Sequence, residues 1–299
     1  MAQPSTLNRS LELAGTLPAL MVAADRVAAT VIQGVHGRRR VGQGDAFWQY
    51  RPYRDGDSAG RIDWRQSARS RHLFVRETEW EAAASVWLWR DASPSMHYAS
   101  LRGIDTKAVR AELITLALAS LLADASERVA LLGSGLRPSS GRLAVRRIAE
   151  ALFDEDREAG RVPLPSLPPI VPLPAYGSIV LVSDWLDPLD RIEAVIRHYA
   201  SSGVRGHLVQ VLDPAEEDLP FDGHVKFEGL EAEGEHTVRR VETVRTAYGA
   251  RLAAQKEGLQ RLARPAGWTV HLHRTDRPPQ TVLLSLYLAM ADLRRLSVA

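Results

Sequence analysis

Two short apolar runs, each leading to an aspartate, constrain most strongly how this chain can fold. The first is SVWLW at 85–89, shortly before Asp91, and the second is SIVLVSD at 178–184, which ends on Asp184. Continuous apolar runs of roughly four to eight residues are typical of strands buried on both faces of a parallel sheet. Further strand-like runs follow at RVALLG (128–133), VRGHLVQVLD (204–213) and GWTVHLH (267–273).

Helical patterns separate these strands. We expect helices over the ranges 105–123, 146–153, 188–201, 236–265 and 279–296. The alternation of strand and helix predicts an α/β fold, with a doubly wound, mostly parallel sheet flanked by helices. GRLAV at 141–145 is interpreted as one further short strand.

The sequence pattern divides the 299-residue chain into three parts. Residues 1–33 form an N-terminal helical segment. Residues 34–81 are rich in glycine, aromatic residues and short β-prone runs, so we expect a small N-terminal β-rich segment that packs on the core. Residues 82–299 form the α/β domain, which contains a proline-rich connector at 161–176 and a β excursion at 220–231.

The composition bounds the compartment and the chemistry. The chain has no cysteine, which excludes disulfides and cysteine-based metal sites and favours a reducing compartment. The first 34 residues are interrupted by Arg9, Glu12, Asp25 and Arg26, so the sequence predicts neither a signal peptide nor a membrane span there. We therefore expect a cytoplasmic protein.

The two strand-end aspartates mark the predicted functional site. Ligands of open α/β sheets bind at the carboxyl edge of the strands. Asp91 begins the turn Asp91-Ala92-Ser93-Pro94-Ser95, whose carboxylate and two hydroxyls suit Mg²⁺ or Mn²⁺. We predict Asp91, Ser93, Ser95 and Asp184 as metal ligands. The alternative is a turn whose polar side chains satisfy local backbone amides.

Arginines dominate one stretch of the chain. They occupy positions 38, 39, 40, 51, 54, 61, 65, 69, 71 and 76, and acidic residues are interleaved with them. Because guanidinium pairs with carboxylate in a two-pronged geometry, this pattern favours internal pairing or protein docking. We predict partner binding through Arg51, Arg54, Arg61, Arg65 and Arg69. Nucleic-acid binding through the arginines of 37–76 is the weaker alternative.

The stretch 42–96 carries a dense set of motifs. They comprise Gly42 and Gly44, Arg51 and Tyr53, Gly56 and Asp57, Arg61 to Trp64, Ser67 to Arg69, Val75 to Glu77, and the turn from Asp91 to Met96. In this pattern the chain resembles the bacterial domain-of-unknown-function family 58. The likeness continues more weakly through Ser183 and Asp184 and over 211–217.

This resemblance implies a von Willebrand factor A-like fold with a metal-ion-dependent adhesion site. It also implies a non-enzymatic adaptor that partners a MoxR-type AAA+ ATPase in a chaperone-like system. Many relatives carry N-terminal membrane spans, which this sequence does not show. The family's third hydroxyl ligand, often threonine, is missing from the corresponding loop; Ser139 or Ser140 is the candidate replacement, and we expect metal binding to be weak or absent.

An enzymatic alternative is a Mg²⁺-dependent phosphoester hydrolase that uses Asp91 as its nucleophile. Such enzymes require a second aspartate two residues later, where this chain has Ser93. His271 and His273 alternate on a predicted strand, but no third zinc ligand lies near them in sequence. We interpret Arg61 and Asp63 as a buried ion pair beside a packed Trp64 indole.

Overall fold

The computed structural model describes residues 21–32, 47–52, 64–69, 73–78, 85–230 and 234–296 of the chain. It divides the chain into two compact units, one formed by residues 1–37 and 84–299 and the other by residues 38–83. The predicted packing of residues 34–81 on the core stays a prediction.

The smaller unit contains an antiparallel pair of strands, β1 (Phe47–Pro52) and β2 (Phe74–Thr78), and the short helix α2 (Trp64–Ser67). The Phe74 amide donates a hydrogen bond of 2.9 Å to Ser67 Oγ, which connects the helix to β2. The Trp64 side chain is 65% exposed, so the prediction of a packed indole is wrong. Its predicted neighbours Arg61 and Asp63 lie outside the described residues.

The larger unit is built on a five-stranded sheet in the order β4-β3-β5-β6-β9, and all neighbouring strands are parallel. These strands are β3 (Ser85–Arg90), β4 (Arg128–Leu131), β5 (Ser178–Ser183), β6 (Arg205–Leu212) and β9 (Thr269–Arg274). Every residue of β5 is buried. The continuous apolar runs therefore mark strands covered on both faces, and the predicted parallel α/β sheet is confirmed.

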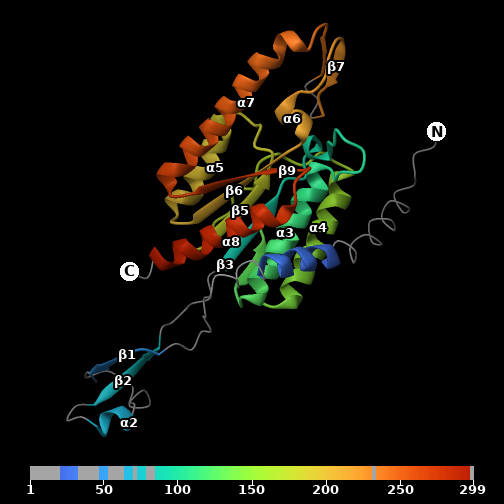
Figure 1. Cartoon of the computed structure of the whole chain (residues 1–299). Helices are drawn as coiled ribbons and strands as arrows, with labels where there is room; N and C mark the ends of the chain where they lie inside the picture. The colour runs from blue at the N-terminus through green and yellow to red at the C-terminus, as the bar shows by residue number, and fades with distance from the viewer. Residues whose placement is uncertain are drawn as a thin grey trace. The chain divides into compact units, whose positions relative to one another are not determined.

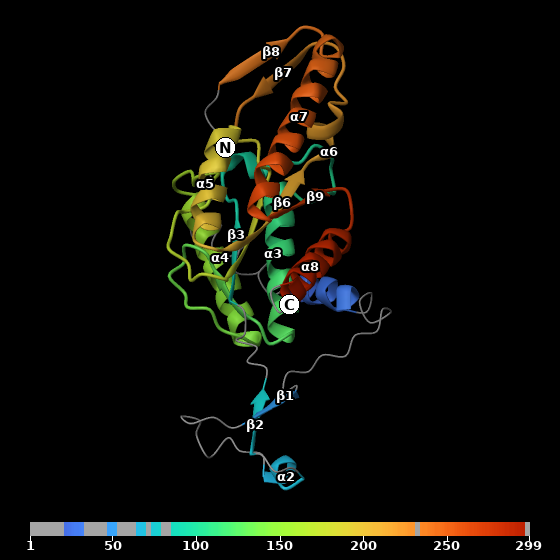
Figure 2. The ribbon, with the colours of Figure 1, turned by 90° about the vertical axis from the view of Figure 1, so that its left-hand side faces the viewer.

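Helices cover both faces of this sheet (Figure 1, Figure 2). One core lies between the sheet and helix 21–32, α3 (Lys107–Asp124), α4 (Arg142–Ala159) and α8 (Pro279–Leu296). The other lies beneath α5 (Leu189–Ser201) and α7 (Glu242–Ala263). Within β3, Val86 and Leu88 face the first core while Trp87 and Trp89 face the second, as the two-residue period of a strand requires.

Two sequence predictions fail at helix starts. Residues 141–145 are not a strand, because α4 begins at Arg142 and buries Ala144, Val145 and Ile148 along one helical face. Only an isolated bridge between Val129 and Ser139 pairs this region with the sheet. The helix expected from 236 begins at Glu242, since residues 235–238 form a strand.

A β-hairpin lies between β6 and α7. After the short helix α6 (Pro214–Asp218), strands β7 (Val225–Glu228) and β8 (Glu235–Val238) pair in antiparallel fashion. The remaining short elements are the 3₁₀ turns η2 (Pro94–His97) and η3 (Arg264–Ala266). In the ranges that the structure describes, no helix is long and apolar enough to cross a membrane.

The topology places a switch point between β3 and β5. From β3 the chain leaves through α3 on one face of the sheet, and from β5 it leaves through α5 on the other face. In open α/β sheets, such a reversal opens a crevice at the carboxyl ends of the two strands, where ligands bind. The first residues after these strands are Asp91 and Asp184.

Candidate functional site

Asp91 lies at the bottom of this crevice and is fully buried. Its Oδ1 accepts a 2.7 Å hydrogen bond from the Ser93 amide, and its Oδ2 accepts a 2.8 Å bond from Ser183 Oγ. The Asp91 amide in turn donates to the carbonyl of Val182 on β5. These three bonds hold the carboxylate rigidly across the ends of β3 and β5.

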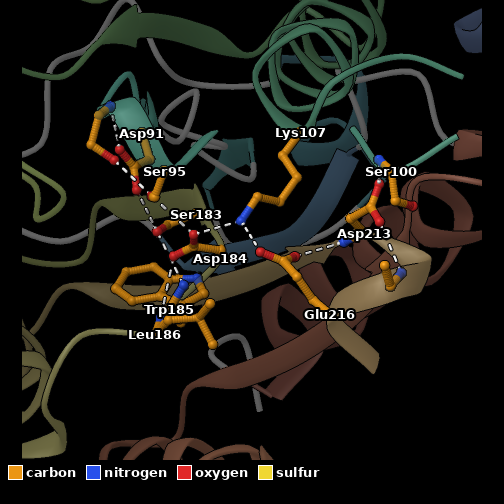
Figure 3. A network of polar contacts seen from close by, with 12 residues as sticks. Asp91, Ser95, Ser100, Lys107, Ser183, Asp184, Trp185, Leu186, Asp213 and Glu216 are labelled. Atoms are coloured by element: carbon orange, nitrogen blue, oxygen red, sulfur yellow. Dashed lines mark hydrogen bonds and ion pairs between the residues drawn. The ribbon is translucent and has the colours of Figure 1, made fainter. Parts of the chain in front are cut away.

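The turn after Asp91 connects the two strand ends through its hydroxyls. Ser93 Oγ and Ser95 Oγ lie 3.1 Å apart and share a hydrogen bond. Ser95 Oγ then donates a 3.0 Å bond to Asp184 Oδ2 (Figure 3). The structure therefore brings all four predicted metal ligands, Asp91, Ser93, Ser95 and Asp184, into one contiguous cluster.

A buried lysine that sequence reasoning missed completes this cluster (Figure 3). Lys107 Nζ lies 2.9 Å from Asp184 Oδ2 and 2.5 Å from Glu216 Oε1, and its side chain is 1% exposed. Burial lowers the pKa of Lys107, but the carboxylates of Asp184 and Glu216 raise it by more, so this pKa lies above its usual range. Lys107 is therefore a fixed positive charge beside the predicted metal ligands.

Local turns position the acids that Lys107 bridges. Asp213 caps α6: its Oδ1 accepts from the Ala215 amide, and the Glu216 side chain accepts from the Asp213 amide, which together form a capping box. Asp213 Oδ2 also accepts from the Ser100 amide. Glu216 is thereby held so that its second oxygen faces Lys107.

Negative charge exceeds positive charge in this cluster. Asp184 and Glu216 contact Lys107, and Asp91 and Asp213 belong to the same hydrogen-bonded network, in which Lys107 is the one ammonium group (Figure 3). Burial, and secondly the charge of Asp184, raises the pKa of Asp91 to about 7, although hydrogen bonds from Ser93 and Ser183 oppose the rise. A cation beside these carboxylates would relieve their repulsion.

The hydroxyl and carboxylate oxygens fit a small divalent cation. At the Mg²⁺–oxygen distance of about 2.1 Å, adjacent octahedral ligands lie about 3.0 Å apart. The hydrogen bonds of 3.1 Å between Ser93 Oγ and Ser95 Oγ and of 3.0 Å between Ser95 Oγ and Asp184 Oδ2 hold these oxygens at a separation that adjacent ligands of one cation could also have. Within the described ranges no group of three or more His, Cys, Asp or Glu side chains is placed to hold a metal ion, so a cation here would depend on the two serine hydroxyls beside Asp91 and Asp184.

A cavity of about 670 Å³ opens above the cluster. Ser95, Lys107 and Asp184 form its floor, whereas Asp91 and Ser93 are not among its lining residues. Its walls come from α6, α7 and β7. A ligand that enters the cavity therefore meets Ser95 and Asp184 first, and Asp91 lies one layer deeper.

Other predicted residues lie apart from the cluster. Ser139 pairs with Val129 near the beginning of β4, and Val129 pairs with Val86 of β3. Asp91 follows Val86 by five residues, so Ser139 lies about 16 Å from Asp91 along the strand direction, at about 3.3 Å per residue. The structure thus does not bring Ser139, or Ser140 beside it, to the other ligands.

The predicted partner-binding arginines belong to the smaller unit. Arg65 and Arg69 are exposed there. Arg51 lies in β1 with its side chain undescribed, and Arg54 and Arg61 lie outside the described residues. Their partner-binding role stays a prediction.

His271 and His273 are buried on β9, and both ring nitrogens of His271 have hydrogen-bonding partners. His271 Nδ1 lies 3.0 Å from Ser285 Oγ of α8, and its Nε2 lies 2.8 Å from Thr269 Oγ1. Burial lowers the pKa of both histidines to about 4. Both side chains are therefore neutral at physiological pH.

This fold and cluster define an open α/β domain with an acid and hydroxyl site at its topological switch point. The family described as "Protein of unknown function DUF58" matches residues 49–258, and the chain belongs to this family. The resemblance predicted from the motifs of 42–96 is thereby confirmed.

Similar proteins come from three bacteria. Uncharacterized proteins of Mycobacterium bovis and of Mycobacterium tuberculosis are each 24% identical over 300 residues, covering 92% of this chain and 89% of their own length. A crystal structure of an aerotolerance-related membrane protein from Bacteroides fragilis is 15% identical, with a TM-score of 0.43, and covers 70% of this chain and 99% of that one.

Proposed function

We propose that the chain is a non-enzymatic, metal-dependent protein-binding module with a von Willebrand factor A-like fold. Asp91, Ser93, Ser95 and Asp184 would hold Mg²⁺ or Mn²⁺, directly or through water. The observation that carries the proposal is the convergence of oxygens from Ser93, Ser95 and Asp184 at the switch point between β3 and β5.

The bound cation would supply an electrophilic centre that accepts a carboxylate from a partner protein. The two serine hydroxyls are neutral ligands, so the shell still has room for an external acid beside Asp91 and Asp184. Lys107 holds Asp184 in place and adds positive charge at the cavity floor. We propose a MoxR-type AAA+ ATPase as the partner, on the family resemblance of 42–96, and a cytoplasmic location.

A partner-binding assay with two serine variants tests this proposal. Ser95→Ala removes the hydroxyl between Ser93 and Asp184, whereas Ser201→Ala removes an exposed hydroxyl at the end of α5. We expect the ATPase to bind wild type and Ser201→Ala in Mg²⁺, and to bind Ser95→Ala at least about tenfold more weakly, a loss of about 1.4 kcal/mol. Equal affinity for all three proteins would refute the proposal.

The phosphoester hydrolase is the weaker candidate function. Asp91 is fully buried, and both of its oxygens already accept hydrogen bonds, from Ser93 and Ser183. A nucleophilic carboxylate needs an oxygen that can reach the phosphorus. We expect no turnover of p-nitrophenyl phosphate in Mg²⁺; turnover that disappears in Asp91→Asn would favour the hydrolase instead.

A further inference from the structure

The wall of the site cavity includes an exposed strand edge. Residues 225–230, which comprise β7 and the two residues after it, all line the cavity. Successive side chains of a strand point to opposite faces, so a cavity bounded by consecutive residues runs along the strand's edge. β7 pairs with β8, and the described part of the chain provides no strand on its other side. Backbone donors and acceptors of that edge therefore face the cavity.

Apolar side chains accompany this edge. Phe221 and Phe227 pack edge to face with their ring centroids 5.9 Å apart, and both line the cavity. Leu219 and Leu230 line it as well, and Leu230 is 47% exposed. Apolar surface gathered inside a cavity is typical of a binding site for large apolar side chains.

The proposed cation would make the lining of the cavity complementary to an acidic ligand group. Lys107 has three N–H donors, and the described residues provide two acceptors, on Asp184 and Glu216. Lys226 and Arg191 also line the cavity, paired with Glu235 and Asp187. The acidic side chains of the lining are those of Asp184, Asp187, Glu216 and Glu228. Acids therefore exceed bases by one in the lining, and a divalent cation at Ser95 and Asp184 would reverse that balance, so a carboxylate is the complement of the cavity once the cation is bound.

We propose that an extended segment of a partner protein adds to the free edge of β7 as a third strand. Its acidic side chain would reach Ser95, Asp184 and their cation, and a nearby large apolar side chain would pack against Phe221, Phe227 and Leu230. This inference rests on the proposed function, because the acid completes the shell of the cation. Backbone pairing supplies affinity in such strand addition, while side-chain pockets supply specificity.

A peptide selection provides the first test. Random dodecamer peptides displayed on phage are selected on the full chain in millimolar Mg²⁺. We expect enriched sequences with an aspartate or glutamate within two positions of a phenylalanine, leucine, isoleucine or valine. No enrichment, or enriched sequences without an acid, would overturn the proposal.

The selected peptide then tests the edge and the apolar wall separately. We expect methylation of alternate backbone amides of the peptide to weaken binding at least about tenfold, because it removes the donors of a paired strand. Leu230→Ser should weaken binding by a similar factor. Leu143→Ser, which alters a leucine that is 50% exposed on α4 and outside the cavity, should leave affinity unchanged.

Metal titration separates failure of this inference from failure of the proposed function. Mg²⁺ binding should be equal in wild type, Leu230→Ser and Leu143→Ser. If Mg²⁺ binds but the methylated peptide and Leu230→Ser retain full affinity, strand addition is refuted while the metal-dependent module stands. If Mg²⁺ does not bind wild type, the proposed function itself fails.

Discussion

At the scale of single residues, Lys107 determines the charge of the candidate site. Its ammonium bridges Asp184 and Glu216 across the end of the sheet. Removing one partner of a buried ion pair leaves an uncompensated charge, which costs far more than losing an exposed pair. The structure provides an exposed pair for comparison in Lys226 and Glu235, which are both more than half exposed.

We therefore expect Lys107→Met to lower the free energy of unfolding by about 3–5 kcal/mol. Lys226→Met should lower it by less than about 1 kcal/mol. Mg²⁺ should restore part of the stability of Lys107→Met, because a cation at Asp184 replaces the lost charge. Urea unfolding with and without Mg²⁺ measures all three effects. Equal stability of the two variants would contradict the role assigned to Lys107.

Two buried histidines predict how stability depends on pH. Burial lowers the pKa of His271 and His273 from 6.5 to about 4 in the folded chain. Between these values the unfolded chain binds more protons, so stability decreases as the pH falls from about 7 to about 4. A shift of this size corresponds to about 3 kcal/mol per histidine at pH 4.

Urea unfolding of His273→Gln across this pH range tests that prediction. The variant should lose less stability than wild type between pH 7 and pH 4, whereas His236→Gln, at an exposed position, should follow wild type. Parallel pH profiles for all three proteins would show that His273 is accessible to protons in the folded chain.

The sequence pattern predicts the positions of Asp91 and Asp184 but not that of Lys107. Asp91 and Asp184 each follow a buried strand, so parallel strand order alone brings them to one edge. Lys107 and Glu216 reach the same point only through the packing of α3 and α6. A weak signal existed for Lys107, because a cation in the first turn of a helix is unfavourable and implies a nearby acid.

At the scale of elements, the close packing of α7, η3 and β9 against β6 depends on one glycine. A Cβ atom added at Gly206 would overlap the indole of Trp268, which is 5% exposed and donates from Nε1 to the Val204 carbonyl. Gly249 in α7 offers the opposite case, because a Cβ atom there meets nothing within 4 Å.

The same substitution at these two glycines should have opposite effects. We expect Gly206→Ala to destabilise the fold by about 1–3 kcal/mol through overpacking against Trp268. Gly249→Ala should stabilise it by about 0.5–1 kcal/mol, because alanine favours a helix interior. Thermal unfolding compares the two. An unchanged midpoint for Gly206→Ala would mean that the indole moves freely.

Element types were predictable where the apolar pattern was long and failed where it was short. The buried strands ending at Asp91 and Asp184 were recognised because their apolar runs are continuous. GRLAV at 141–145 fits a strand or the first turn of a helix equally well by pattern. The segment is a helix because a helix places Ala144, Ile148 and Leu152 on one face, where they are buried against the core beside the sheet. That packing cannot be seen in the local sequence pattern.

At the scale of the whole molecule, the chain combines the site-bearing unit with a separate arginine-rich unit of residues 38–83. In the smaller unit, the exposed positions of Arg65 and Arg69 make both side chains available to a partner.

We expect the double variant Arg65→Ala/Arg69→Ala to keep its stability within about 0.5 kcal/mol, as exposed substitutions generally do. Its affinity for the proposed ATPase partner should fall. Fluorescence anisotropy should detect no binding of duplex DNA by wild type of the kind that weakens steeply as the salt concentration rises. If the variant binds the ATPase normally and wild type binds DNA in a salt-dependent manner, the arginines are a nucleic-acid surface instead.

The most direct test of the proposed metal site is a calorimetric titration of Mg²⁺ and Mn²⁺ into three full-length proteins. These are wild type, the double variant Ser93→Ala/Ser95→Ala, and Ser201→Ala as the matched hydroxyl control. We predict saturable binding of one ion by wild type and Ser201→Ala, and loss of that binding in the double variant. Absence of binding by wild type, or equal binding by all three, would contradict a cation site at Asp91, Ser93, Ser95 and Asp184.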